Sequence, residues 1–245
     1  MVGSGRPPVI TLLVAPGSRA VGERLELDEE EAHHLKVRRG EHGARVRFRD
    51  GAGVGGVGTV EVGGRRPVLA VELLEVAAPP PSLVLAVGAG DRDRFSWLVE
   101  KAAELGVTDV VPLATARTAD VATRVRDVHV EKLARRAREA IKQSGALWAP
   151  RVLPPVPFAA FVDAPRPGAC WILDGAGRPP EALDRAEPVT VLVGPEGGFT
   201  EAERAQAVQA GFRPVRIGPH TLRFETAAVA AAALIQSARD RGANG

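Results

Sequence analysis

The chain has 245 residues and a formal net charge of +2 at pH 7, with 45% hydrophobic and 25% charged residues. This composition indicates a globular protein of one large or two medium domains and excludes collagen-like and disordered classes. No apolar run reaches the roughly 18 residues of a membrane-spanning helix, and we expect no signal peptide. The single cysteine, Cys170, excludes a disulfide framework, so we expect a cytoplasmic protein.

Residues 1–76 have the pattern of short strands joined by glycine-rich turns, which is typical of a small β-barrel. One helix is predicted at 28–37. The strands are predicted in VITLLV (9–14), ARVRFRD (44–50), VGTVEV (57–62) and PVLAVELLEV (67–76). The run GVGGVG (53–58) matches a dinucleotide-binding pattern, but no helix follows it, so we interpret it as a flexible hairpin connection.

The proline run in AAPPPS (77–82) is the predicted linker, because such runs are stiff and extended. After it, from 83 to 245, strand-like and helix-like stretches alternate, which predicts a parallel sheet covered by helices on both faces. The strands are predicted in SLVLAVG (82–88), TDVVPLA (108–114), CWILDG (170–175), VTVLVG (189–194) and VRIG (215–218). The helices are predicted in DRFSWLVEKAAELG (93–106), EKLARRAREAIK (131–142), TEAERAQAVQAGF (200–212) and ETAAVAAAALIQSARDRG (225–242).

Two successive strands of this region end in Gly-Pro turns, VGPEGGFT (193–200) and IGPHTLRFET (217–226). Thr200 and Glu203 fit a capping box, so the first turn leads directly into a helix. Ligands of open α/β sheets bind at the carboxyl ends of strands, and glycine lets main-chain groups approach them closely. The two turns therefore either hold a flat heterocycle or are ordinary strand-to-helix connections. A third turn, GAGDRD (88–93), is a weak candidate for a dinucleotide-binding turn, because the last glycine of that pattern is missing.

Positive charge is concentrated between Arg117 and Arg151, with nine Lys or Arg against four Asp or Glu. This segment is either a surface for a phosphate backbone or a solvated helix face with i,i+4 ion pairs. Cys170 lies in an apolar stretch and is interpreted as a buried small side chain rather than a nucleophile. His33 and His34 have no third ligand nearby in the sequence, so no metal site is predicted.

Five stretches in this order resemble the RsmE family of ribosomal RNA methyltransferases, in the SPOUT superfamily. They are HHLKVRRGE (33–41), EKAAELGV (100–107), REAIKQS (138–144), LVGPEGGFTEAE (192–203) and IGPHTLRFETA (217–227). The resemblance implies a PUA-like RNA-binding β-barrel at 1–76 and a SPOUT α/β domain at 83–245 with a deep trefoil knot. It also implies a homodimer that uses S-adenosyl-L-methionine to methylate N3 of a uridine, the m3U1498 site, in 16S rRNA of the small ribosomal subunit.

The resemblance further implies which residues act. Arg223 would stabilise negative charge that develops on the uracil, and the alternative is a structural arginine paired with Glu225. Glu196 would lie at the rim of the pocket, and its alternative role is to accept main-chain hydrogen bonds at a helix start. Glu196, Glu225 and His220 all remain open as the general base. The cofactor would be bound by Leu173, Val193, Gly194, Pro195, Gly197, Gly198, Ile217, Gly218, Pro219, Leu222 and Thr226. The RNA would be bound by His33, His34, Lys36, Arg38, Arg39, Arg135, Arg136, Arg138, Lys142 and Gln143.

The chain departs from the family pattern at three places. Gly145 to Trp148 follow Gln143-Ser144 where an Arg is frequent, Phe224 stands where Thr is common, and the first residues lack the usual aromatic and basic opening. Two other functions stay open. One is methylation of another RNA such as tRNA, and the other is RNA binding without catalysis.

Overall fold

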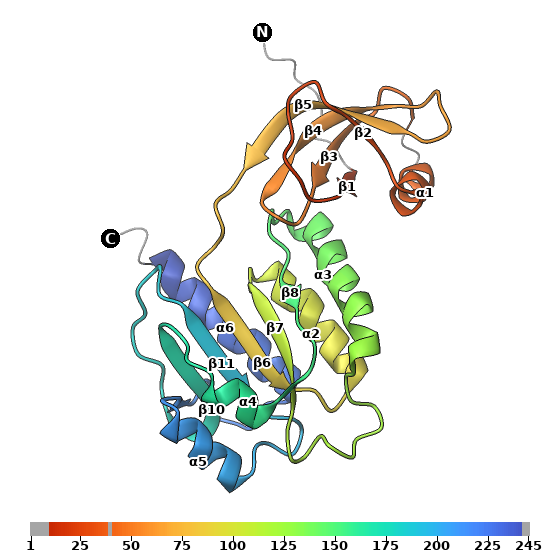
Figure 1. The fold of residues 1–245 in the computed structure, drawn as a ribbon. Helices are drawn as coiled ribbons and strands as arrows, with labels where there is room; N and C mark the ends of the chain where they lie inside the picture. The colour runs from red at the N-terminus through yellow and green to blue at the C-terminus, as the bar shows by residue number, and fades with distance from the viewer. Residues whose placement is uncertain (1–9, 39–40, 242–245) are drawn as a thin grey trace. The chain divides into compact units, whose positions relative to one another are not determined.

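The computed structural model describes residues 10–38 and 41–241, and the chain divides into two compact units (Figure 1). The first unit contains residues 1–79 and 138–149, and the second contains 80–137 and 150–245. The division after residue 79 falls inside the stretch predicted as a linker. The segment 138–149 joins the first unit although its sequence lies within the predicted C-terminal domain.

The first unit is built on a five-stranded sheet in the order β1-β3-β4-β5-β2. Strand β1 runs parallel to β3, and the other neighbours are antiparallel. Among the described residues β1 and β2 form the two edges, so this sheet is open and mixed where the pattern predicted a small barrel. The strands are β1 (Thr11–Leu13), β2 (Arg24–Glu26), β3 (Arg45–Arg49), β4 (Val54–Glu61) and β5 (Val68–Val76).

The core of this unit comes from the alternation that the sequence displays. Val46 and Phe48 of β3 are fully buried, while Arg45 before them and Arg47 between them are exposed. Helix α1 (Glu29–Val37) begins at Asp28, whose carboxylate accepts a hydrogen bond from the Glu31 N–H at 2.8 Å. Its Leu35 packs into the same core.

The glycine run 53–58 lies mostly inside β4, so its interpretation as a hairpin connection is wrong. A Cβ on Gly56 would lie 2.0 Å from the Leu73 carbonyl oxygen, and one on Gly58 would lie 2.4 Å from that of Ala70. Strand β5 approaches β4 too closely there for any side chain, and a bulge lies between Val57 and Gly58. The glycines are therefore required by sheet packing rather than by a turn.

The second unit contains a seven-stranded parallel sheet. Six strands follow the order β12-β10-β11-β6-β7-β8, and β9 pairs with β7. The strands are β6 (Leu83–Gly88), β7 (Asp109–Ala114), β8 (Arg151–Val152), β9 (Val156–Pro157), β10 (Ala169–Arg178), β11 (Val189–Val193) and β12 (Arg213–Val215). The predicted strand at 215–218 is displaced, because β12 ends at Val215.

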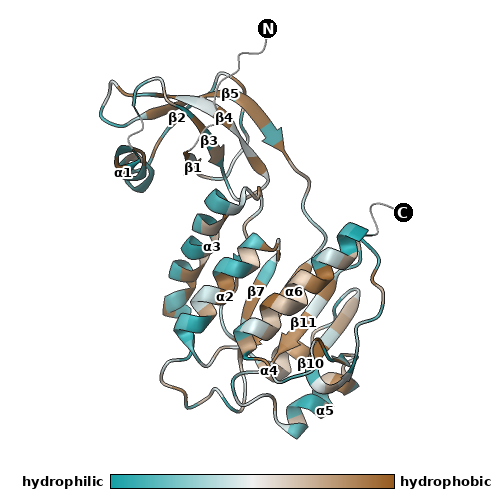
Figure 2. Cartoon of the chain, turned by 180° about the vertical axis from the view of Figure 1, so that it is seen from behind, coloured by the Kyte–Doolittle hydropathy of each residue, from teal (hydrophilic) through white to brown (hydrophobic). Residues whose placement is uncertain are grey.

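Helices cover both faces of this sheet. They are α2 (Arg92–Glu104), α3 (Val130–Ser144), α4 (Phe158–Asp163), α5 (Glu201–Gln209) and α6 (Phe224–Arg241), and a 3-10 turn η1 (Asp127–His129) precedes α3. Helices α2 and α6 pack together, and α6 also packs on β6 and β11. Helices α4 and α5 contribute to the apolar cluster that contains Ala86, Ile172 and Leu192. Figure 2 shows the central strands mostly in the hydrophobic colour and α3 mostly in the hydrophilic one.

Helix α2 has one apolar face at helical spacing, since Phe95, Leu98, Val99 and Ala102 are buried and Leu105 is half-buried. Among the described residues, no helix is long and apolar enough to cross a membrane.

The close approach of β4 and β5 can be tested by Gly56→Ala. The added methyl group would meet the Leu73 carbonyl, so we expect the free energy of unfolding to fall by about 1–3 kcal/mol in denaturant titrations. Gly63→Ala is the matched control, because its added Cβ would meet no atom within 4 Å. Equal stability of the two variants would contradict the packing argument.

Candidate functional site

The two Gly-Pro turns lie at the same edge of the parallel sheet. Strand β10 pairs with β11 on one side and with β12 on the other. The turn 194–200 leaves the end of β11, and the turn 216–223 follows β12. Because parallel strands place their carboxyl ends together, the two turns converge beside the end of β10.

A cavity of about 270 Å³ lies between these turns. Its walls combine main-chain groups of four glycines with apolar side chains and a few polar ones. The lining residues are Leu173, Asp174, Gly175, Val193, Gly194, Pro195, Glu196, Gly198, Phe199, Arg204, Val215, Arg216, Ile217, Gly218, His220, Thr221, Leu222, Phe224 and Ala227.

The shape of the turn after β11 depends on small residues in two places. Gly198 adopts a φ of 72° and donates its N–H to the Pro195 carbonyl at 2.7 Å. Pro195 packs against the end of β6, where a Cβ on Gly88 would lie 2.5 Å from the Pro195 Cδ. The turn is thus held against the neighbouring strand by contacts that a larger residue would prevent.

The predicted capping box is confirmed, and it has a further partner. The Glu203 carboxylate accepts hydrogen bonds from the Thr200 N–H at 2.8 Å and from the Ala116 N–H at 2.8 Å. The Thr200 hydroxyl in turn accepts from the Glu203 N–H at 3.2 Å. Glu203 therefore fastens the first Gly-Pro turn both to α5 and to the loop that follows β7.

The predicted cofactor residues divide into two groups. Eight of them line the cavity, namely Leu173, Val193, Gly194, Pro195, Gly198, Ile217, Gly218 and Leu222. Gly197, Pro219 and Thr226 lie outside its lining. Pro219 and Thr226 are exposed, and Gly197 lies against the side chain of Arg117.

Glu196 lines the cavity, and its side chain is directed toward the loop after β6. Its Oε2 lies 2.6 Å from the position that a Cβ on Gly90 would take. Arg223 is exposed and stands between two lining residues, Leu222 and Phe224. Glu225 is buried, and its Oε2 has no hydrogen-bond partner within the described part of the chain. An Arg223–Glu225 ion pair is absent from the same part.

Three charged lining residues, Asp174, Arg204 and Arg216, were missed by the sequence interpretation. Asp174 and Arg204 form an ion pair, and Asp174 Oδ1 also accepts from the Ala176 N–H at 2.9 Å. Asp174 follows the buried segment of β10 and precedes a glycine, as Glu196 does after β11. The sequence Leu173-Asp174-Gly175 thus carries the same pattern as the turn after β11, a carboxylate followed by a glycine, and this pattern could have identified Asp174.

The predicted RNA-binding residues that the structure describes lie on α1, at its C-cap Arg38, and on α3. His33, Lys36, Arg38, Arg135, Arg136 and Gln143 are exposed, and Arg39 lies outside the described residues. Arg136 is paired with Glu100. His34 is half-buried, and its pKa is lowered by burial and by the nearby Lys142 and Arg38.

Two of these residues are engaged within the first unit. Lys142 Nζ lies 2.5 Å from Glu31 and 3.0 Å from Glu139. Burial raises the pKa of Glu31, and the nearby Lys142 ammonium opposes this shift. Arg138 donates to the Val14 carbonyl at 3.3 Å. Removal of Lys142 would leave the buried Glu31 carboxylate without its cation. A substitution of Lys142 would therefore change protein stability as well as any binding of RNA.

Cys170 is half-buried against the apolar cluster of the second unit, and burial raises its pKa. A raised pKa reduces the thiolate fraction, which does not favour a nucleophile. No group of three His, Cys, Asp or Glu suited to a metal ion occurs among residues 10–38 and 41–241.

Comparison with known proteins identifies relatives that match most of the second unit, and some of them match nearly the whole chain. The family model described as an RNA methyltransferase domain matches residues 78–236. The ribosomal RNA small subunit methyltransferase E of Aquifex aeolicus is 31% identical over 171 residues, which is 68% of this chain and 73% of that protein. The protein of the same name from Synechocystis is 30% identical over 166 residues, covering 64% of this chain and 54% of that protein.

A solved structure is similar over nearly the full length. It is a ribosomal RNA small subunit methyltransferase E from Neisseria gonorrhoeae bound to S-adenosyl methionine, with a TM-score of 0.80 and 27% identity. The match covers 93% of this chain and 97% of that one.

The fastening role of Glu203 can be tested by Glu203→Ala. The change removes the acceptor for the Ala116 and Thr200 amides, so we expect a loss of about 1–2 kcal/mol in unfolding free energy. Hydrogen exchange at the Ala116 amide should also become faster. Glu201→Ala is the matched control from the same helical turn, with a side chain that is 89% exposed. Unchanged exchange at Ala116 would contradict the assignment.

Proposed function

The chain belongs to the family of ribosomal RNA small subunit methyltransferase E, the RsmE family of the SPOUT superfamily, and from this premise we propose its reaction. It methylates N3 of a uridine in 16S rRNA of the small ribosomal subunit, at the m3U1498 site, with S-adenosyl-L-methionine as the methyl donor. The observation that carries this proposal is the glycine-lined cavity between two strand ends of the sheet.

The cavity has the chemical character that such a donor requires. Gly194, Gly198 and Gly218 offer main-chain groups, and Leu173, Val193 and Leu222 offer apolar surface for a flat heterocycle. A Cβ on Gly194 would lie 3.0 Å from the Gly198 Cα, so a side chain there would deform the wall. When bound, S-adenosyl-L-methionine supplies a methyl group already activated by its sulfonium.

The protein's own task is then to position the uracil and to assist the loss of its N3 proton. Orientation alone contributes on the order of 7–11 kcal/mol in well-arranged reactions. Negative charge develops over N3 and the flanking carbonyl oxygens, and an exposed cation beside the cavity stabilises it. Arg223 is assigned this role because it stands between two lining residues without an ion pair to Glu225 in the described structure.

The candidates for the general base are three residues in or next to the cavity wall. Glu196 and His220 line it, whereas Glu225 is buried beside the lining residue Phe224. Glu196 also contacts the loop after β6 through its position over Gly90, which supports a second task in holding the rim of the cavity. Uracil N3 is on the pairing edge, so the target nucleotide must be unpaired or extruded.

The remaining features of the proposal come from family membership. The segment 1–76 is a PUA-like RNA-binding module, 77–82 a linker and 83–245 a SPOUT domain whose C-terminal segment forms a trefoil knot. The enzyme acts in the cytoplasm as a homodimer. The exposed Trp97 of α2 and Leu234 of α6, on two helices that pack together, support a subunit contact there. The basic residues of α1 and α3 bind the rRNA.

The reaction is tested by incubating the purified chain with S-adenosyl-L-methionine and small subunits from a strain that lacks the gene. Mass mapping of the RNA should then show one new methyl group on uridine N3. Methylation of tRNA instead would show that the substrate is another RNA. Binding of RNA without any methylated product would show that the protein binds RNA without catalysis.

Arg223→Ala should lower kcat by about 100-fold or more, because a cation that acts in the transition state is lost. Calorimetry should show unchanged affinity for S-adenosyl-L-methionine. The control is Arg185→Ala, an exposed arginine in the segment that precedes β11, at the opposite edge of the sheet. Wild-type kcat in Arg223→Ala would remove this residue from the mechanism while leaving the proposed reaction intact.

A further inference from the structure

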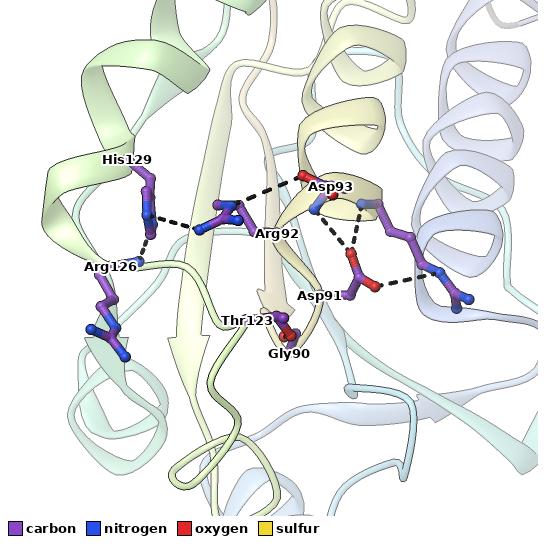
Figure 3. A network of polar contacts seen from close by, with 8 residues as sticks. Gly90, Asp91, Arg92, Asp93, Thr123, Arg126 and His129 are labelled. Carbon is purple, nitrogen blue, oxygen red and sulfur yellow. Dashed lines mark hydrogen bonds and ion pairs between the residues drawn. The ribbon is translucent and has the colours of Figure 1, made fainter.

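A cluster of four basic side chains lies where α2 and α3 begin. Arg92 is the first residue of α2, Arg126 precedes η1, His129 ends η1, and Lys132 lies in the first turn of α3. Figure 3 shows the Arg92 guanidinium directed toward the His129 ring, and Arg126 below that ring with its side chain extending away from it. The proposed reaction assigns no role to Arg92, Arg126 or His129.

The hydrogen bonds of His129 determine which of its ring nitrogens carries the proton. The Arg126 N–H donates to His129 Nδ1 at 3.0 Å, so Nδ1 is the acceptor and the proton of the neutral ring is on Nε2. Arg92 Nη1 lies 3.3 Å from that same Nε2. A guanidinium N–H cannot donate to a nitrogen that already carries hydrogen. Two donors therefore lie side by side, where one acceptor can bind both.

The charges around the ring are predominantly positive. The pKa of His129 is lowered by partial burial and then by the charges of Arg92, Arg126 and Lys132. One carboxylate, Asp93, is near Arg92, at 4.0 Å from its Nε, and that side chain is 96% exposed. The neighbouring Asp91 is engaged as the cap of α2, accepting from the Asp93 and Arg94 amides.

The cluster is connected to the loop beside the cavity through the hydrogen bonds of Thr123. The Arg92 N–H donates to the Thr123 carbonyl at 3.0 Å, and the Thr123 hydroxyl donates to the Gly90 carbonyl at 2.9 Å. Gly90 is the residue over which the Glu196 carboxylate lies. The loops after β6 and β7 thus fix the cluster at the same edge of the sheet as the cavity.

We propose that Arg92 and His129 bind a backbone phosphate of the RNA substrate, with Arg126 and Lys132 adding positive charge nearby. This inference rests on the proposed function, since it assigns part of the RNA to the second unit, beside the cofactor cavity. A phosphate oxygen accepts from the Arg92 guanidinium and from His129 Nε2–H together, and its charge is attracted by the three cations around the neutral ring. The contact positions the nucleotide chain and carries no sequence preference.

The test compares Arg92→Gln/Arg126→Gln with Arg185→Gln/Arg241→Gln, which removes equal charge from the opposite edge of the sheet. That edge is identified by Arg239 of α6, which donates to the Ser82 and Glu187 carbonyls just before β6 and β11. Both variants are measured for binding of a single-stranded 16S-derived oligoribonucleotide across a salt series, without cofactor. Both are then measured for methylation kinetics and for affinity toward S-adenosyl-L-methionine.

We expect the first variant to raise the RNA dissociation constant and KM about tenfold relative to the control. We also expect the slope of log affinity against log salt to become shallower by roughly 1.4, for two lost cations beside single-stranded RNA. The kcat and the cofactor affinity should not change. Equal RNA affinity and salt slope in the two variants would overturn the proposal, as would a loss confined to kcat.

The two hypotheses fail in distinguishable ways. RNA binding that depends on the cluster, without methylation of any uridine, would remove the proposed reaction and retain the phosphate site. Methylation with equal KM in both variants would retain the reaction and remove the site. A salt-dependent loss of binding to a polyaspartate peptide, with RNA binding unaffected, would reassign the cluster to an acidic protein partner and count against the proposal.

Discussion

The parallel register of β12, β10, β11 and β6 is the constraint on which the candidate site depends. It places the exits of β11 and β12 on the two sides of β10, so that two turns distant in sequence share one cavity. Close contacts then fix the turns, with Pro195 against Gly88 and Glu196 over Gly90. Glu203 adds hydrogen bonds from the helix start and from the loop after β7. The cavity is thus a product of the sheet, and the glycines remove the side chains that would fill it.

Much of the second unit could be predicted from the sequence, because its signals are local. The 3.6-residue periodicity located α2, the Thr200–Glu203 pair located the start of α5, and continuous apolar runs located β6 and β11. The two-residue strands β8 and β9 carry too short a pattern to detect. Eight of the eleven predicted cofactor residues line the cavity, because the two Gly-Pro turns mark the strand ends between which it lies. Asp174 and Arg204 were missed because the ion pair between them joins positions thirty residues apart.

Long-range packing accounts for the other differences. The glycines of β4 resembled a turn because the sequence cannot show that the β5 carbonyls approach them within about 2 Å of a Cβ position. The segment 138–149 resembled a continuation of the α/β region, yet its Arg138 and Lys142 bond to Val14 and Glu31 of the first unit. A basic helix pattern does not distinguish a cation that is free to meet RNA from one that neutralises a buried carboxylate. The structure distinguishes these two cases through the exposure of each cation and the partner that it contacts. Lys142 contacts the buried Glu31, whereas Arg92 contacts His129 at the surface.

The central claim is that main-chain groups of the two Gly-Pro turns hold the methyl donor. The most direct measurement is a titration of the isotope-labelled chain with S-adenosyl-L-methionine, followed by amide chemical shifts and hydrogen exchange. We expect the amides of 193–198 and 216–222 to shift together and to become protected, with a single binding constant. Binding that leaves both turns unperturbed, or saturating concentrations that produce no binding, would contradict the account.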